Sequence, residues 1–238
     1  MNELMSVLTR IPFLRDEDQA SCESLAALAS CRTFPKGNIL FHDGDPCHAV
    51  YLVISGRVKL VLAGEDGREL ALEMFDPGDV CGMVGTLDEG PHVGTAMTLT
   101  PARIAMIPSD AFRRWLAERP RLHQTIVIQL TQMLRHAYDR VGMQVLLSVK
   151  HRVRAELLEL ARKDGAPDAT TELVVRRPTH QEIAERVGST REVVSRALKT
   201  LLEEDTGIQM EGRVLRVSLR SVETPDLSAR GGRSGEWR

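Results

Sequence analysis

The first half of the chain alternates between short apolar runs and glycines, which occur every few residues from residue 34 onward. The runs between the glycines are Ile39–Phe41, Val50–Ile54, Arg57–Leu62, Glu69–Phe75, Thr95–Leu99 and Arg103–Ile107. Such runs between glycine and Asp-Gly turns, here with a hairpin signal at residues 64–67, are typical of antiparallel strands. We therefore expect a compact β-roll. Residues 1 to about 34 are expected to form short helices, one of them starting at Asp16 or Asp18.

A helical period replaces the strand period after residue 108. Ser109 is expected to cap a short helix, and Pro120 to begin a longer one. Apolar positions on the longer helix recur at steps of three and four: Leu122, Ile126, Leu130, Met133, Leu134, Ala137, Val141 and Val145. Such a stripe suits a two-helix coiled coil, or packing against the chain's own β-roll. The first interpretation assigns a dimer interface to Ile126, Leu130, Met133, Ala137 and Val141.

Residues 178–201 predict two short helices joined by a tight turn. Thr179 can cap the first helix, with Glu182 as its capping-box partner. Gly188 can end that helix, because glycine takes the left-handed conformation without strain. Ser189 or Thr190 then starts the second helix, whose buried side is Val193, Val194, Ala197, Leu198 and Leu201.

The segments before and after this helix pair also predict regular elements. A helix is expected from Ser148 to Gly165 and a strand over Thr171–Arg176, and Ile208–Val217 alternates around a Glu-Gly turn. The alternation predicts a hairpin. A helix pair followed by a hairpin indicates a winged helix-turn-helix, whose second helix lies in the DNA major groove.

The outward side of the second helix carries Arg191, Glu192, Ser195 and Arg196, which we call the base-reading face. Arginine can bond both acceptors of guanine, and glutamate can accept from the cytosine amine. The alternative is an ordinary solvated face of an amphipathic helix. The hairpin that follows favours the DNA-binding interpretation.

The segment TxQEIAxxVGxxREVVSRxLKxL, followed by a short wing, resembles the DNA-binding domain of the Crp/Fnr family of bacterial transcription regulators. The resemblance implies that Arg191, Glu192 and Arg196 read a TGTGA-like half-site, and that Ser195 matches a reading position of the oxygen-responsive branch. It also implies a homodimer on a palindrome resembling TGTGA-N6-TCACA, with RNA polymerase as a partner. Contacts to DNA phosphates are expected from Thr179, Gln181, Ser189, Thr190, Lys199 and Arg213.

The β-rich stretch resembles the cyclic-nucleotide-binding fold of the same family, through Gly37, Leu40, Gly44, Tyr51, Gly56, Val58, Gly78 and Asp79. The expected fold class is α+β. The expected parts are a sensor β-roll (1–119), a dimerisation helix (120–147), a winged helix-turn-helix (148–220) and a disordered tail (221–238), since the tail lacks periodicity.

The sensor half departs from its nucleotide-responsive relatives, in which a glutamate holds the ribose and an arginine the cyclic phosphate. Met83 and Val93 occupy these positions, and Ala137 and Tyr138 replace a Thr-Ser pair that touches the base. A buried phosphate opposite valine would have no paired charge, which is costly. We therefore expect no dependence on cAMP.

Three hypotheses for the effector remain: no small ligand, a different and perhaps apolar ligand, or redox, nitric oxide or heme sensing. Cys81 falls where a carbon-monoxide-sensing relative has its heme thiolate, but Met83 replaces that relative's histidine. No C-x-x-C pair occurs among Cys22, Cys31, Cys47 and Cys81, so neither a metal nor a cofactor is expected.

Composition narrows the function classes. The 238 residues allow two modest domains, and a net charge of −2 argues against a general DNA coat. A local basic surface is still expected from Arg176, Arg177, Arg186, Arg191, Arg196, Lys199 and Arg213.

There is no signal peptide or membrane-spanning run, so we expect a cytoplasmic protein. Catalytic motifs are also absent from the sequence, so no enzyme is expected; the competing class is a cyclic-nucleotide-fold module that does not bind DNA.

Overall fold

The computed structural model describes residues 2–15, 17–65, 69–167, 172–205 and 207–218. The chain divides into two compact units between Met133 and Leu134, and this division falls inside helix α5 (Pro120–Leu146). The expected boundaries at 119, 147 and 220 remain predictions, because compactness divides the long helix between the two units.

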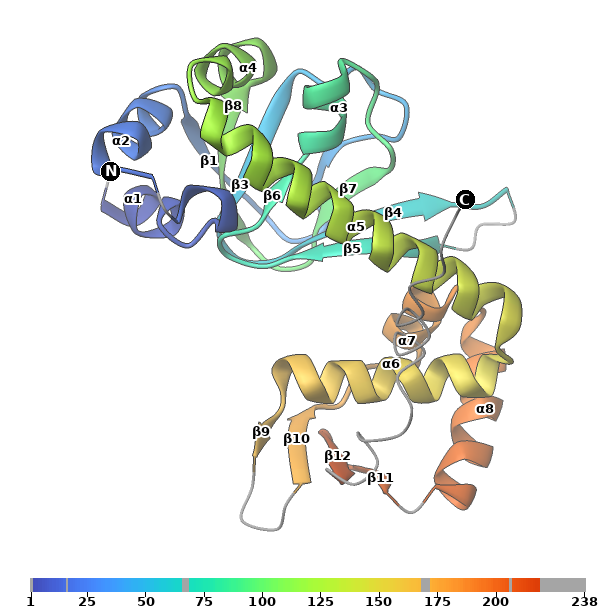
Figure 1. Ribbon diagram of the computed structural model, residues 1–238. Coiled ribbons are helices and arrows are strands. Elements are labelled where there is room, and N and C mark those ends of the chain that lie inside the picture. Colours follow the sequence, from blue (N-terminus) through green and yellow to red (C-terminus); the bar gives the residue numbers. More distant parts are fainter. Residues whose placement is uncertain (1, 16, 66–68, 168–171, 206, 219–238) are drawn as a thin grey trace, which may run out of the picture. The chain divides into compact units, whose positions relative to one another are not determined.

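The first unit is made of antiparallel strands and short helices (Figure 1). Its helices are α1 (Asn2–Leu8), the 3-10 turn η1 (Pro12–Leu14), α2 (Gln19–Ala27), α3 (Met83–Asp88) and α4 (Ser109–Ala117). Its strands are β1 (Ser30–Phe34), β2 (Ile39–Phe41), β3 (Ala49–Ser55), β4 (Val58–Ala63), β5 (Glu69–Phe75), β6 (Val80–Cys81), β7 (Thr95–Thr98) and β8 (Ala102–Pro108). They form two four-stranded sheets, β1-β8-β3-β6 and β2-β7-β4-β5, which confirms the predicted antiparallel β-roll and the α+β class.

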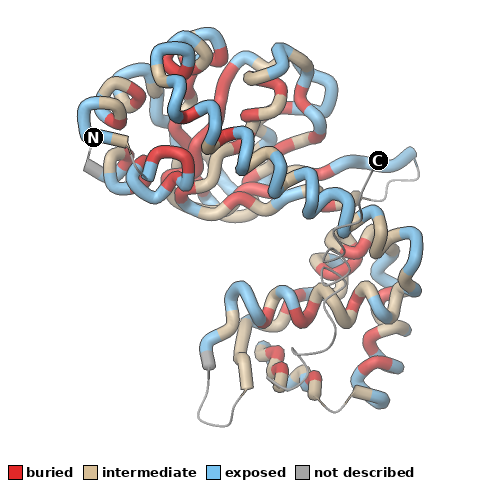
Figure 2. The backbone as a smooth tube through the Cα atoms, in the orientation of Figure 1, coloured by how far each residue is buried: buried red, intermediate tan, exposed pale blue. Residues whose placement is uncertain are grey.

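Strand β3 is central to this unit because both of its faces are buried, as the coloured tube in Figure 2 shows. Val50, Leu52 and Ile54 face a core shared with α1, α2, α4 and the first turns of α5. Tyr51 and Val53 face a second core, formed by residues of both sheets. A strand buried on both faces is apolar at successive positions rather than at alternate ones, as the sequence of β3 is.

The second unit, which includes the end of α5, contains α6 (Val149–Asp164), α7 (His180–Val187) and α8 (Arg191–Glu204). Its sheet has the order β11-β12-β10-β9, with β9 (Ala166–Pro167), β10 (Glu172–Arg176), β11 (Ile208–Glu211) and β12 (Val214–Ser218). One core joins the three helices to the sheet, with Leu157, Ile183, Leu198 and Leu215 almost fully buried. The predicted helix pair and hairpin are confirmed.

The sequence located six strands of the first unit with ends that differ by no more than one residue from those of the structure. The prediction was wrong for β1, which lies in the stretch expected to be helical. The prediction was also wrong for Ser109, which is the first residue of α4 rather than its cap. The Ser109 hydroxyl instead donates to the Cys47 carbonyl oxygen at 3.0 Å. The predicted helix start at Asp18 is confirmed, because its carboxylate accepts from the Ser21 N–H at 2.7 Å. Residues 66 and 67 of the predicted turn, Thr171 and the tail 221–238 lie outside the described residues.

Candidate nucleic-acid interface

The start of α7 is held by the predicted capping box. The Thr179 hydroxyl accepts from the Glu182 N–H at 3.1 Å, and the Glu182 carboxylate accepts from the Thr179 N–H at 2.6 Å. Arg176 adds an ion pair to Glu182 at 2.7 Å. Burial opposes ionisation of Glu182, but these bonds outweigh it and lower the pKa of the carboxyl group. The entry to the helix pair is therefore fixed by side chains that local sequence supplies.

The turn between α7 and α8 is held from both ends. Gly188 adopts φ +60°, a conformation that favours glycine, and Thr190 caps α8 by accepting from the Val193 N–H at 3.4 Å. From the end of α5, Gln144 donates to the Val187 carbonyl oxygen at 2.9 Å. The long helix thus binds directly to the last turn of α7.

The buried side of α8 fixes which residues face outward. Val194, Leu198 and Leu201 pack into the core of the second unit. Arg191, Glu192 and Arg196 are consequently exposed at the start of α8, and within the described part of the chain none of them makes an ion pair. Three charged groups with unused hydrogen-bonding capacity therefore share one helical face.

Ser195 differs from the other members of the base-reading face. It is half-buried, and its hydroxyl lies 2.7 Å from Nδ1 of His180, the first residue of α7. Partial burial, and then the nearby Arg177 and Arg191 guanidinium groups, lower the pKa of His180. Sequence reasoning missed His180, because only the tight turn brings these two helices together.

The expected phosphate-binding residues lie around this face. Thr179, Gln181, Thr190, Lys199 and Arg213 are exposed, and Ser189 is half-buried. Two of these hydroxyls already serve as helix caps, and the Gln181 amide donates to Glu185 at 3.1 Å. Lys199 and Arg213 make no ion pair within the residues described, so they are the cations best placed to meet phosphates.

The expected basic surface is smaller than the sequence implied. Arg186 bonds Glu156 at 2.8 Å, and both side chains are largely buried. Burial of Glu156 raises the pKa of its carboxyl group in spite of this pair. Arg176 is exposed but paired with Glu182. The prediction for Arg186 was therefore wrong, because its charge is compensated inside the unit.

The long helix carries two apolar stripes. Leu122 and Ile126 are buried in the first unit's own core, where Ile126 keeps only 3% of its surface exposed, and Leu130 packs against the same core. Ile126 and Leu130 thus follow the alternative that the sequence left open, packing on the β-roll. A second set, about 100° around the helix, is exposed and follows steps of four and three: Val127, Thr131, Leu134, Tyr138, Val141 and Val145, which we call the exposed stripe.

The sensor half places Met83 and Val93 in different environments. Met83 begins α3 and is buried in the helical core, whereas Val93 is 49% exposed. Neither side chain offers a charge or a hydrogen bond to a nucleotide. Beside them, His92 stacks on Phe41 with ring centroids 3.5 Å apart and is itself buried.

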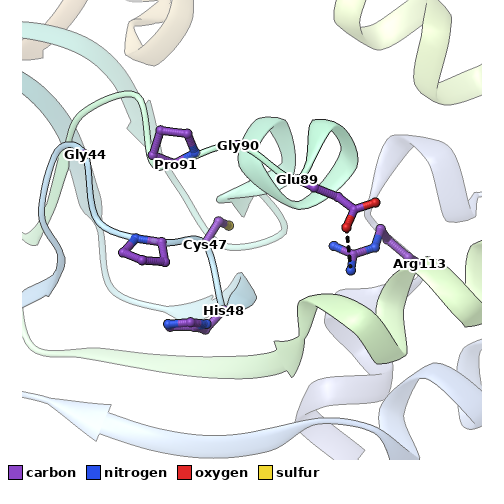
Figure 3. A pocket seen from close by; sticks show the side chains of 8 residues that line it. Gly44, Cys47, His48, Glu89, Gly90, Pro91 and Arg113 are labelled. Carbon is purple, nitrogen blue, oxygen red and sulfur yellow. Dashed lines mark ion pairs between the residues drawn. The ribbon is translucent and has the colours of Figure 1, made fainter.

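An open hollow of about 410 Å³ lies on the surface of the first unit (Figure 3). Two of its charged side chains pair with each other: Arg113 bonds Glu89 at 3.4 Å, and Arg113 also donates to the Thr86 carbonyl oxygen at 3.1 Å. The Cys47 thiol lies 3.3 Å from the Thr86 hydroxyl and 3.4 Å from the Gly82 carbonyl oxygen. Cys81 is fully buried, which raises the pKa of its thiol well above the usual range.

No cluster of three His, Cys, Asp or Glu side chains able to hold a metal ion occurs in the part of the chain that the structure describes. Among the described helices, none combines the length and the apolar character needed to cross a bilayer.

Comparison with known proteins relates both units to one family. Residues 31–119 match the family described as cyclic nucleotide-binding domain, and residues 151–221 match the Crp-like helix-turn-helix domain. The chain is 30% identical over 212 residues to the CRP-like cAMP-activated global transcriptional regulator of Mycobacterium tuberculosis, covering 89% of this chain and 94% of the relative. It is 29% identical over 185 residues to the cAMP-activated global transcriptional regulator CRP of Escherichia coli, covering 76% and 86%.

Comparison with solved structures finds regulators of the same fold. The c-di-GMP responsive global regulator CLP of Xanthomonas campestris superposes with a TM-score of 0.73 and 26% identity, covering 84% of this chain and 99% of that one. A CRP/FNR-family transcriptional regulator from Thermus thermophilus gives a TM-score of 0.63 and 26% identity, covering 82% and 96%.

Proposed function

The chain belongs to the Crp/Fnr family of transcription regulators, and from this premise we propose that it binds a palindromic DNA site as a homodimer. The exposed base-reading face at the start of α8 is the observation that carries this proposal. Its outward arginines and glutamate can bond guanine and cytosine edges, and the helix is narrow enough to enter the major groove. We assign no catalytic reaction, in keeping with relatives that are regulators rather than enzymes.

The proposed dimer uses the exposed stripe of α5. The stripe has the four-three spacing of a coiled-coil seam, and its members Tyr138 and Val145 are 67% and 77% exposed. A partner helix would remove this apolar surface from water. Met133 and Ala137 lie on the same side of the helix as the buried Ile126, and Val141 belongs to the exposed stripe. The dimer interface proposed here therefore lies about one residue, or 100°, around the helix from the interface that was expected from the sequence.

Two recognition helices related by two-fold symmetry would read half-sites about one helical turn apart. We propose a site of the TGTGA-N6-TCACA type, with Arg191 and Arg196 on guanines and Glu192 on a cytosine of the opposite strand. RNA polymerase as a partner and the cytoplasm as the location belong to the same proposal.

We propose further that cAMP is not the effector, although both sequence relatives are named as cAMP-activated. The support is local: buried Met83 and exposed Val93 supply no partner for the ribose or the phosphate. The burial and raised pKa of Cys81 argue against it as an accessible thiolate ligand or redox sensor.

The test is selection of DNA fragments from a random duplex library by the purified full chain at physiological salt. We expect a palindromic consensus that is the same with and without millimolar cAMP. Recovery of unrelated sequences would instead support a module of this fold that does not read DNA.

A further inference from the structure

Within the residues that the structure describes, His180 is the histidine that contacts the base-reading face. Its Nδ1 lies 2.7 Å from the Ser195 hydroxyl oxygen, a hydrogen bond between the first turn of α7 and the second turn of α8. Both residues are half-buried, so the contact is partly shielded from water. Ser195 is therefore held by a group whose hydrogen-bonding role changes with protonation.

The charges that face His180 come from both neighbouring elements. Partial burial disfavours the imidazolium most, and Arg177, which precedes α7, and Arg191, which begins α8, disfavour it further and so lower the pKa of His180. The Glu182 carboxylate is occupied by the Thr179 N–H and by Arg176. In the free protein the imidazole is consequently neutral at physiological pH, with a pKa below the ordinary 6.5.

Protonation of the imidazole changes what the serine can do. A neutral imidazole can accept the Ser195 O–H, which leaves the serine oxygen able to accept from the amine of cytosine or adenine. An imidazolium carries a hydrogen on both nitrogens, so Nδ1 can only donate to the serine oxygen. The serine O–H is then free to donate to acceptors of the base, such as guanine O6 or thymine O4.

We propose that His180 is a specificity-determining residue that sets, through Ser195, whether a donor or an acceptor is preferred on the DNA base that Ser195 meets. The inference rests on the proposed docking of α8 in the major groove. It adds that the preferred operator changes with pH at one base pair of each half-site.

Protonation of His180 and DNA binding should favour each other. Phosphates near the bound helix pair stabilise the imidazolium, so the pKa of His180 is higher on DNA than in the free protein. DNA binding therefore takes up a proton, and affinity rises as pH falls through the bound-state pKa. One proton per half-site sets the limit, which is about tenfold in affinity per pH unit for each subunit.

The experiment compares random-library selections by the full-length protein at pH 6 and pH 8, at constant salt. For the wild type we expect base pairs presenting acceptors to be enriched at least threefold at the position of Ser195 at pH 6, with the other positions unchanged. His180→Gln keeps a side chain that can donate or accept but does not titrate, so it should give the same consensus at both pH values. Ser195→Ala should lose the preference at both.

His42→Gln is the matched control, because His42 is an exposed histidine of the first unit, and the pH response should persist in it. Circular dichroism at both pH values checks that each variant is folded. An identical wild-type palindrome at pH 6 and pH 8, or an undiminished response in His180→Gln, would overturn this inference alone. Selection of no sequence by the wild type would overturn the proposed function and the inference with it.

Discussion

Arg196 and Lys199 lie one turn apart on α8, both exposed, yet they are expected to meet different parts of the duplex. Base edges carry sequence information, whereas phosphates contribute affinity that depends on salt. The helical period of the sequence was enough to place both side chains outward. It could not reveal the contact between His180 and Ser195, because that contact depends on how the turn at Gly188 folds α7 onto α8.

Arg196→Ala should cost about 1–3 kcal/mol on the selected site and relax the preference at one base pair. Lys199→Ala should weaken binding to all sequences equally and lower the slope of log affinity against log salt by about one. Fluorescence anisotropy with specific and scrambled duplexes over a salt series separates the two effects. An unchanged consensus for Arg196→Ala would contradict the assumed docking of α8.

At the scale of elements, glycine turns and apolar runs predicted most strands, but β1 was missed for a physical reason. Its residues Ser30–Thr33 are all exposed, so the strand has no buried side to produce an alternating pattern. The apolar pattern of α5 shows a related limit. On α5 two apolar stripes lie side by side, and periodicity does not state which one the chain's own core covers.

Leu134→Glu combined with Val141→Glu should dissociate the dimer, because like charges would be buried against their symmetry mates. Ile128→Glu is the matched control: Ile128 is equally exposed on α5 but lies outside the exposed stripe, so this variant should stay dimeric. Light scattering of the purified variants measures both. A persistent dimer in the double variant would place the interface elsewhere.

Thr179→Ala should lower the free energy of opening of α7 by about 1 kcal/mol, because the Glu182 N–H loses its acceptor. Amide hydrogen exchange of α7 is the appropriate measurement, since a molecule with two units need not unfold in one step. Thr200→Ala, in an exposed interior turn of α8, should leave α7 protection unchanged. Equal losses in the two variants would show that the cap does not control the stability of this helix.

At the scale of the whole molecule, the family fold does not by itself determine the effector. The two domains match the family, whereas Met83 and Val93, which the resemblance aligns with nucleotide-contacting residues, carry no charge. Millimolar cAMP should therefore leave the dissociation constant for the selected duplex unchanged. A tenfold tightening, about 1.4 kcal/mol, would refute this claim.

Competition binding of the purified protein at about 150 mM salt decides whether α8 reads a palindrome. The competitors are the selected palindrome, the same duplex with one half-site inverted, and a scrambled duplex of equal composition. The palindrome is expected to bind at least about 10³-fold more tightly than the scrambled duplex, and the duplex with one intact half-site should have an intermediate affinity. Affinities within tenfold for all three duplexes would contradict it.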